Sequence, residues 1–112
     1  MAKKEDKLYL NDIWEAILKI EKYTKGLSYE EFLNNMMVID AVVRNLEIIG
    51  EATKNLSKEI KSQYPEIPWK EMAGIRDKLI HEYFGIDLDI VWKTIKYRLP
   101  ELKKYLKREI ER

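Results

Sequence analysis

The stretch MMVIDAVVRNLEIIGEATKNL, residues 36–56, decides the fold. Apolar side chains occupy most of the circumference of a helix with 3.6 residues per turn, so this stretch predicts a long helix that is enclosed on most sides. Its charges form one narrow stripe, with steps of four, three and four residues: Asp40, Arg44, Glu47 and Glu51. The stripe is either a solvated ladder of ion pairs or the polar wall of a groove. A helix of this kind is buried better by a bundle and a partner chain than by one small chain alone.

Two amphipathic segments flank this helix. The first is expected to end at Gly26 and carries an apolar stripe at three- and four-residue steps: Leu10, Ile13, Trp14, Ile17, Ile20 and Thr24. The second begins at the predicted N-cap Asp87 and carries a longer stripe: Leu88, Val91, Trp92, Ile95, Leu99, Leu102, Leu106 and Ile110. Because the stripe continues across Pro100, we expect a kinked helix there and not a long loop.

Shorter helices are expected between these segments. Ser28 and Glu31 have the spacing of a capping box that opens a short helix, Tyr29–Leu33. Residues 57–64 predict another short helix, and Pro68 suits the first turn of the helix that follows.

The composition indicates a single all-α domain, residues 1–112, with four principal helices. Four Gly and three Pro provide little turn-forming material for a β-sandwich or barrel.

The composition also excludes several kinds of site. The absence of Cys excludes disulfides and thiol nucleophiles, and no apolar run approaches the roughly 20 residues of a membrane span. No apolar signal segment follows the basic start, so a cytoplasmic location is expected. With a net charge of +1, the chain must hold any polyanion through local groups.

Residues 74–85 combine the single His of the chain, His81, with other side chains suited to chemistry. Asp77 precedes His81 by four residues, so on a helix its carboxylate would orient the imidazole or form a buried structural pair with it. Arg76 lies about 140° from His81 around a regular helix, so the two cannot converge on one ligand there. Either the helix loosens before Gly85, or two copies of the segment meet across a two-fold axis.

Three blocks of this sequence closely resemble the HEPN-domain toxins of the HepT type. They are Arg76-x4-His81-x-Tyr83 followed by residues 84–87 (FGID), residues 44–52 (RNLEIIGEA) and residues 67–69 (IPW). The resemblance covers nearly the whole chain and implies a homodimeric bundle of four or five helices. It also implies the toxin of a type VII toxin-antitoxin system, a metal-independent endoribonuclease, together with an MNT-type nucleotidyltransferase antitoxin that transfers AMP to the motif Tyr.

Carried over residue by residue, the resemblance makes Arg76 and His81 the catalytic pair, Asp77 a supporting residue and Tyr83 the adenylylation target. The expected substrate is RNA, either tRNA or mRNA, and no metal or other cofactor is expected. Cleavage without a metal needs a base, an acid and a cation on the phosphate. With one His per chain, these groups favour a composite site between two subunits.

A non-catalytic alternative remains open at this level. In it the same bundle is the helical, nucleotide-binding partner of a nucleotidyltransferase, and Arg76 and His81 bind phosphate only.

The charged stripe, Asp40, Arg44, Glu47 and Glu51, becomes a supporting layer of the site or a contact for the antitoxin. Basic residues of the last helix form either a track for an RNA backbone or a solvated face: Lys93, Lys96, Lys103, Lys104, Lys107 and Arg108.

Overall fold

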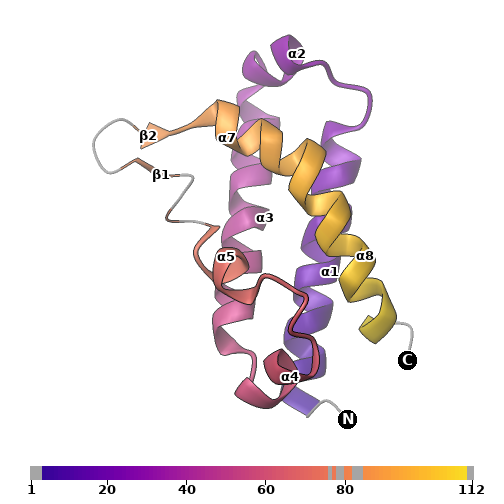
Figure 1. The fold of residues 1–112 in the computed structure, drawn as a ribbon. Helices are drawn as coiled ribbons and strands as arrows, with labels where there is room; N and C mark the ends of the chain where they lie inside the picture. The colour runs from indigo at the N-terminus through magenta and orange to yellow at the C-terminus, as the bar shows by residue number, and fades with distance from the viewer. Residues whose placement is uncertain (1–3, 76, 78–79, 82–84, 111–112) are drawn as a thin grey trace.

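Three long helical segments form the body of the protein. The computed structural model describes residues 4–75, 77, 80–81 and 85–110. Helix α1, Lys4–Thr24, and helix α3, Met36–Asn55, run in opposite directions and pack along each other. The third segment comprises α7, Leu88–Lys93, the π-helical turn η1, Thr94–Arg98, and α8, Leu99–Ile110, which packs on α1 (Figure 1). The predicted all-α class is confirmed.

The interior of this body is built by the apolar stripes predicted from the sequence. Fully or almost fully buried side chains include Leu10, Ile13, Ile17 and Ile20 of α1, Val42, Leu46 and Ile49 of α3, and Leu99, Leu102 and Leu106 of α8. Asp6 is also buried, and its carboxylate accepts hydrogen bonds from the backbone N–H and the hydroxyl of Ser57, at 2.9 and 2.6 Å. This pair ties the start of α1 to the end of the molecule where helix α4, Lys58–Gln63, lies.

Side-chain caps start the short helices that the sequence predicts. Helix α2, Tyr29–Leu33, opens with the complete capping box of Ser28 and Glu31. Helix α4, Lys58–Gln63, starts at Ser57, whose hydroxyl accepts from the N–H of Ile60 at 3.2 Å. Each cap satisfies a donor at the first turn that has no partner within the helix.

The helix around Pro100 continues, and its irregularity lies in the turn just before the proline. Proline has no N–H, and its ring crowds the carbonyl four residues earlier. In η1 the helix widens, and the N–H of Leu99 donates to the carbonyl of Thr94, five residues back. The expected helix is therefore confirmed, and the expected disturbance takes the form of a π-helical turn.

The helix expected through His81 is wrong. Helix α5, Trp69–Ala73, is short, and strand β1, Ile80–His81, pairs antiparallel with strand β2, Gly85–Ile86. Residues of high β propensity dominate this stretch: Ile80, Tyr83, Phe84 and Ile86. Gly85, expected to terminate a helix, instead lies opposite His81 in the strand pair.

Among the described helices, none is both long and apolar enough to cross a membrane.

Candidate functional site

The predicted site lies on the connection between α5 and α7. Arg76 and Tyr83 fall outside the described residues, as do the neighbours of Asp77 on both sides. Asp77 itself is exposed, and the backbone of His81 belongs to β1. Since His81 is in a strand, the expected Asp77–His81 pairing on successive turns of one helix is wrong. What the structure defines is how both ends of this connection are anchored.

Gly50 allows the end of α5 to lie close to α3. A Cβ atom at Gly50 would stand 3.4 Å from the carbonyl oxygen of Ala73 and 3.4 Å from Cγ2 of Ile75, so a larger side chain would press on both. Ile75 is buried at this contact, one residue before Arg76. The glycine of the block RNLEIIGEA therefore sets the spacing between α3 and the start of the motif segment.

An ion pair holds α5 on another side. Nε of Arg98 donates to Oε1 of Glu71 at 3.1 Å, and Nη2 of the same guanidinium contacts Oε2. Nη1 of Arg98 donates to Glu101 at 2.7 Å, so the guanidinium is held by two carboxylates. The hydrogen bonds to Glu71 raise the pKa of Arg98 above its ordinary value. The fork of two parallel bonds fixes both distance and orientation between α5 and η1.

The far end of the connection is fixed by the strand pair and α7. The register places Ile80 opposite Ile86 and His81 opposite Gly85. Directly after β2, the side chain of Asp87 accepts from the N–H of Ile90 at 3.2 Å and caps α7. The backbone of His81 is therefore tied to the strand that leads into a capped helix.

Aromatic contacts anchor α7 to α2. Trp92 is half-buried, and its ring lies with centroid distances of 5.7 Å to Tyr29 and 5.1 Å to Phe32. Phe32 is fully buried, so these contacts fix the position of α7 against the body. The helix that receives the strand pair is thereby attached to the same core as α1 and α3.

The charged stripe of α3 lies on the side that is not packed in the core. Asp40, Arg44 and Glu51 are exposed, while Glu47 is partly buried. Met36 and Met37, at the start of the helix, are 75% and 80% exposed. Within one chain α3 is therefore enclosed over most of its circumference, as predicted, and what stays uncovered is the charged stripe with the two methionines.

The sequence has clear relatives. The family described as "Ribonuclease HepT-like" matches residues 13–109. The chain belongs to the HepT-like ribonuclease family. A Methanocaldococcus jannaschii protein named "Putative RNase" is 51% identical over 111 residues, which cover 99% of this chain and 92% of that protein. A Thermococcus cleftensis protein named "Probable ribonuclease HepT" is 52% identical over 101 residues, 90% of this chain and 92% of its own. No solved structure gives a significant match.

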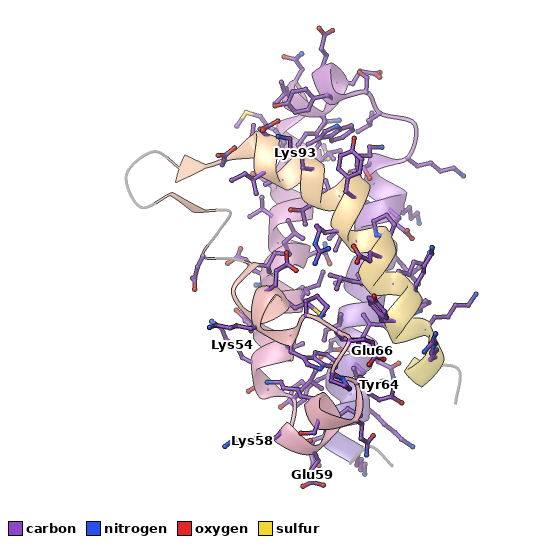
Figure 2. All side chains as sticks on the ribbon, in the orientation of Figure 1. Lys54, Lys58, Glu59, Tyr64, Glu66 and Lys93 are labelled. Atoms are coloured by element: carbon purple, nitrogen blue, oxygen red, sulfur yellow. The ribbon has the colours of Figure 1, made fainter. Side chains whose placement is uncertain are left out.

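In this HepT-like chain, several of the basic residues expected to follow RNA make contacts within the protein. Lys93 of α7, labelled in Figure 2, pairs with Asp89 at 3.0 Å, and that carboxylate raises the pKa of Lys93. Lys96 lies 4.6 Å from the centre of the Trp92 ring. Lys103 pairs with Glu21 of α1 at 2.8 Å. These contacts favour a structural role for that face of α7 and α8.

Two exposed lysines lie elsewhere on the HepT-like fold. Lys54 of α3 and Lys58 of α4 point away from the helices on the side from which the strand pair extends (Figures 1 and 2).

Among the described residues, no three His, Cys, Asp or Glu side chains gather as a metal site would require.

No local pattern in the sequence pointed to Glu71 and Arg98, which are 27 residues apart. Gly50 carried a weak signal, because a glycine within an apolar helix often marks a close approach of another backbone. These three residues belong to the framework of the site and were not among the predicted site residues.

Proposed function

We propose that this chain is the toxin of a type VII toxin-antitoxin system, an endoribonuclease that acts as a homodimer without a metal ion. The single observation that carries the proposal is the motif Arg76-x4-His81-x-Tyr83 in a chain that belongs to the HepT-like ribonuclease family. The anchoring of the motif segment at both ends supports it, because catalytic groups on a connection need a rigid scaffold on either side.

The proposed reaction is attack of an RNA 2′-oxygen on the neighbouring phosphorus with loss of the 5′-oxygen. His81 of one subunit takes the proton from the 2′-hydroxyl, and His81 of the second subunit gives a proton to the leaving 5′-oxygen. Arg76 binds the phosphate oxygens through two parallel N–H donors and stabilises the charge that grows there. Asp77, exposed beside Arg76 in the sequence, supports these groups.

The exposed side of α3 supports the homodimer. Met36 and Met37 present apolar surface next to the charged stripe of Asp40, Arg44 and Glu51. Apolar patches rimmed by polar side chains are typical of protein contacts, and a two-fold axis makes such a patch self-complementary. In the proposed dimer this side of α3 meets its copy or the antitoxin.

Neutralisation is proposed to occur at Tyr83. An MNT-type nucleotidyltransferase antitoxin transfers AMP to the phenol, which places a bulky anion two residues from His81. The added phosphate competes with the RNA phosphate for Arg76 and blocks access by its size. The toxin acts in the cytoplasm on tRNA or mRNA.

The proposal is tested by RNA cleavage in the presence of EDTA. Wild-type protein is expected to cleave, and His81→Ala should lose activity by at least a hundredfold while remaining folded and dimeric. The exposed-surface control Lys19→Ala should cleave normally. Full activity of His81→Ala, or dependence on added metal, would overturn the proposed reaction. Absence of cleavage with retained binding to the nucleotidyltransferase would instead favour the non-catalytic alternative.

The composite site is tested by mixing wild-type protein with an excess of His81→Ala. Each heterodimer then contains one His81, lacks either the base or the acid of the proposed reaction, and should be as inactive as a His81→Ala homodimer. Cleavage should therefore fall to the fraction of wild-type homodimers that remain, whereas an excess of the active control Lys19→Ala should cause no loss. Half of the wild-type activity in the heterodimers would contradict a shared site.

A further inference from the structure

Helix α5 cannot hold its own position, and the structure shows what holds it. It has five residues, far fewer than an isolated helix needs for stability in water. On one side its end lies against Gly50 of α3, and on another its Glu71 is gripped by Arg98 of η1. The close approach at Gly50 brings the end of α5 against α3, whereas the two-pronged ion pair also sets a direction.

Contacts outside α5 already orient Arg98 for this ion pair. Its backbone lies in the π-helical turn η1, and Glu101 of α8 holds Nη1 at 2.7 Å. The remaining nitrogens of the guanidinium face Glu71. The two carboxylates thus have different roles. Glu101 orients the Arg98 side chain relative to α8, and Glu71 links that orientation to α5.

We propose that Glu71 and Arg98 are positioning residues for the active site, because their ion pair sets the direction in which the chain leaves α5 toward Arg76. This inference rests on the proposed function. Glu71 precedes Arg76 by five residues. The intervening Ile75 is buried, lies against Gly50 of α3 and lines one cavity together with Glu71 and Arg98. A tilt of α5 therefore moves the backbone that carries the arginine expected to bind phosphate.

The chain contains a matched control for this ion pair. Lys103 of α8 pairs with Glu21 of α1, and the two side chains are 34% and 38% exposed, against 36% for both Arg98 and Glu71. Both pairs link two helices, but only one involves α5. A third variant, Glu101→Gln, tests how far the orientation of Arg98 matters, because it removes a carboxylate from the same arginine without touching α5.

The test compares Glu71→Gln with Glu21→Gln and Glu101→Gln in the full-length protein. All three are expected to lower Tm slightly and to a similar degree, since each removes one partly exposed ion pair. Glu71→Gln should lower kcat for RNA cleavage by about tenfold with little change in KM, because small misplacements of a catalytic group are costly. Glu101→Gln should lower kcat by less, and Glu21→Gln should leave it unchanged. Arg98→Lys, which keeps the charge but loses the fork, should resemble Glu71→Gln.

Amide hydrogen exchange provides a readout that does not depend on cleavage. The N–H of Gly74 donates to the carbonyl of Lys70 at the end of α5, and its exchange should accelerate in Glu71→Gln but not in the control Glu21→Gln. Equal kcat values for all three variants, or equal exchange at Gly74, would overturn the inference. If wild-type protein does not cleave RNA, the proposed function fails, and exchange at Gly74 alone decides whether the pair positions the segment.

Discussion

The helical body and the connection that carries the motif are stabilised in different ways. In α1, α3 and α8 the stripes of Ile and Leu are buried almost completely, and each helix has neighbours along its length. Between α5 and α7 the described residues instead include the exposed Asp77 and a pair of two-residue strands that extends to one side of the helices (Figure 1). The body supplies stability, while the geometry of the connection depends on its two anchored ends.

Breaking the body should cost the most stability and little catalysis. Ile17 of α1 is fully buried, and Ile17→Ala should lower the free energy of unfolding by about 2–5 kcal/mol through lost burial and the cavity left behind. Urea unfolding measures this loss. The neighbouring Leu18 is 39% exposed, and Leu18→Ala should change stability by less than about 0.5 kcal/mol. A large drop in kcat per folded Ile17→Ala molecule would show that body and connection are not separable.

A change at α7, which anchors the far end of the connection, should cost less stability than Ile17→Ala but should also lower catalysis. Asp87→Ala removes the cap of α7 next to β2 and should cost about 1 kcal/mol, because the first N–H groups of the helix lose their acceptor. Cleavage should fall as well, since β2 then follows a frayed helix. Thermal unfolding and kcat are measured together.

Ser57→Ala is the matched control, because it removes the cap of α4, which lies on the body far along the chain from the motif. Its cost should be at least that of Asp87→Ala, as Asp6 also loses a hydroxyl donor, yet kcat should stay unchanged. Asp87→Asn should restore activity, because asparagine caps helices as well as aspartate does. Equal kcat losses at both caps would contradict a special role for the anchor.

The same contrast explains which features could be predicted from the sequence. The caps at Ser28 and Asp87 use groups three residues apart, so short-range spacing was enough to predict them. The cap at Ser57 was not predicted, although the short helix that it starts was. The helix predicted through His81 was wrong because periodicity over a few residues does not separate a helical turn from a short strand pair. No rule based on spacing along the chain predicts the Glu71–Arg98 contact, because this contact depends on how α5 and η1 pack.

The site residues illustrate a second limit. Asp77 and His81 were expected to meet because both were placed on one helix, and a change of secondary structure between them removed that expectation. The charged stripe on α3 was correctly placed on one side of a helix, but the sequence left open which surface covers it. Whether Arg76, His81 and Tyr83 have the proposed roles stays a prediction for the cleavage and mixing experiments.

The smallest expected effect concerns a cap on the body that titrates in acid. The backbone N–H of Ser28, and secondly its hydroxyl, hold the pKa of the Glu31 carboxyl below its ordinary value of 4.5. A lowered pKa in the folded state means that the ionised carboxylate stabilises the fold above pH 4.5. This stabilisation is lost as the pH falls through the folded-state pKa. Glu31→Gln should therefore lower Tm slightly at pH 6, and the difference from wild type should shrink as the pH is lowered below 4.5.

Glu30→Gln is the control for this titration, because it removes a neighbouring charge from the first turn of α2 without removing the acceptor for the Ser28 N–H. Its Tm difference from wild type should vary less between pH 6 and pH 3 than that of Glu31→Gln. Cleavage measured at pH 6 should be the same in both variants, since the aromatic contacts of α2 are with Trp92, near the end of α7. If Glu31→Gln changed kcat at pH 6, the capping box would be part of the anchor of α7, and the division between body and connection would have to be drawn at α2.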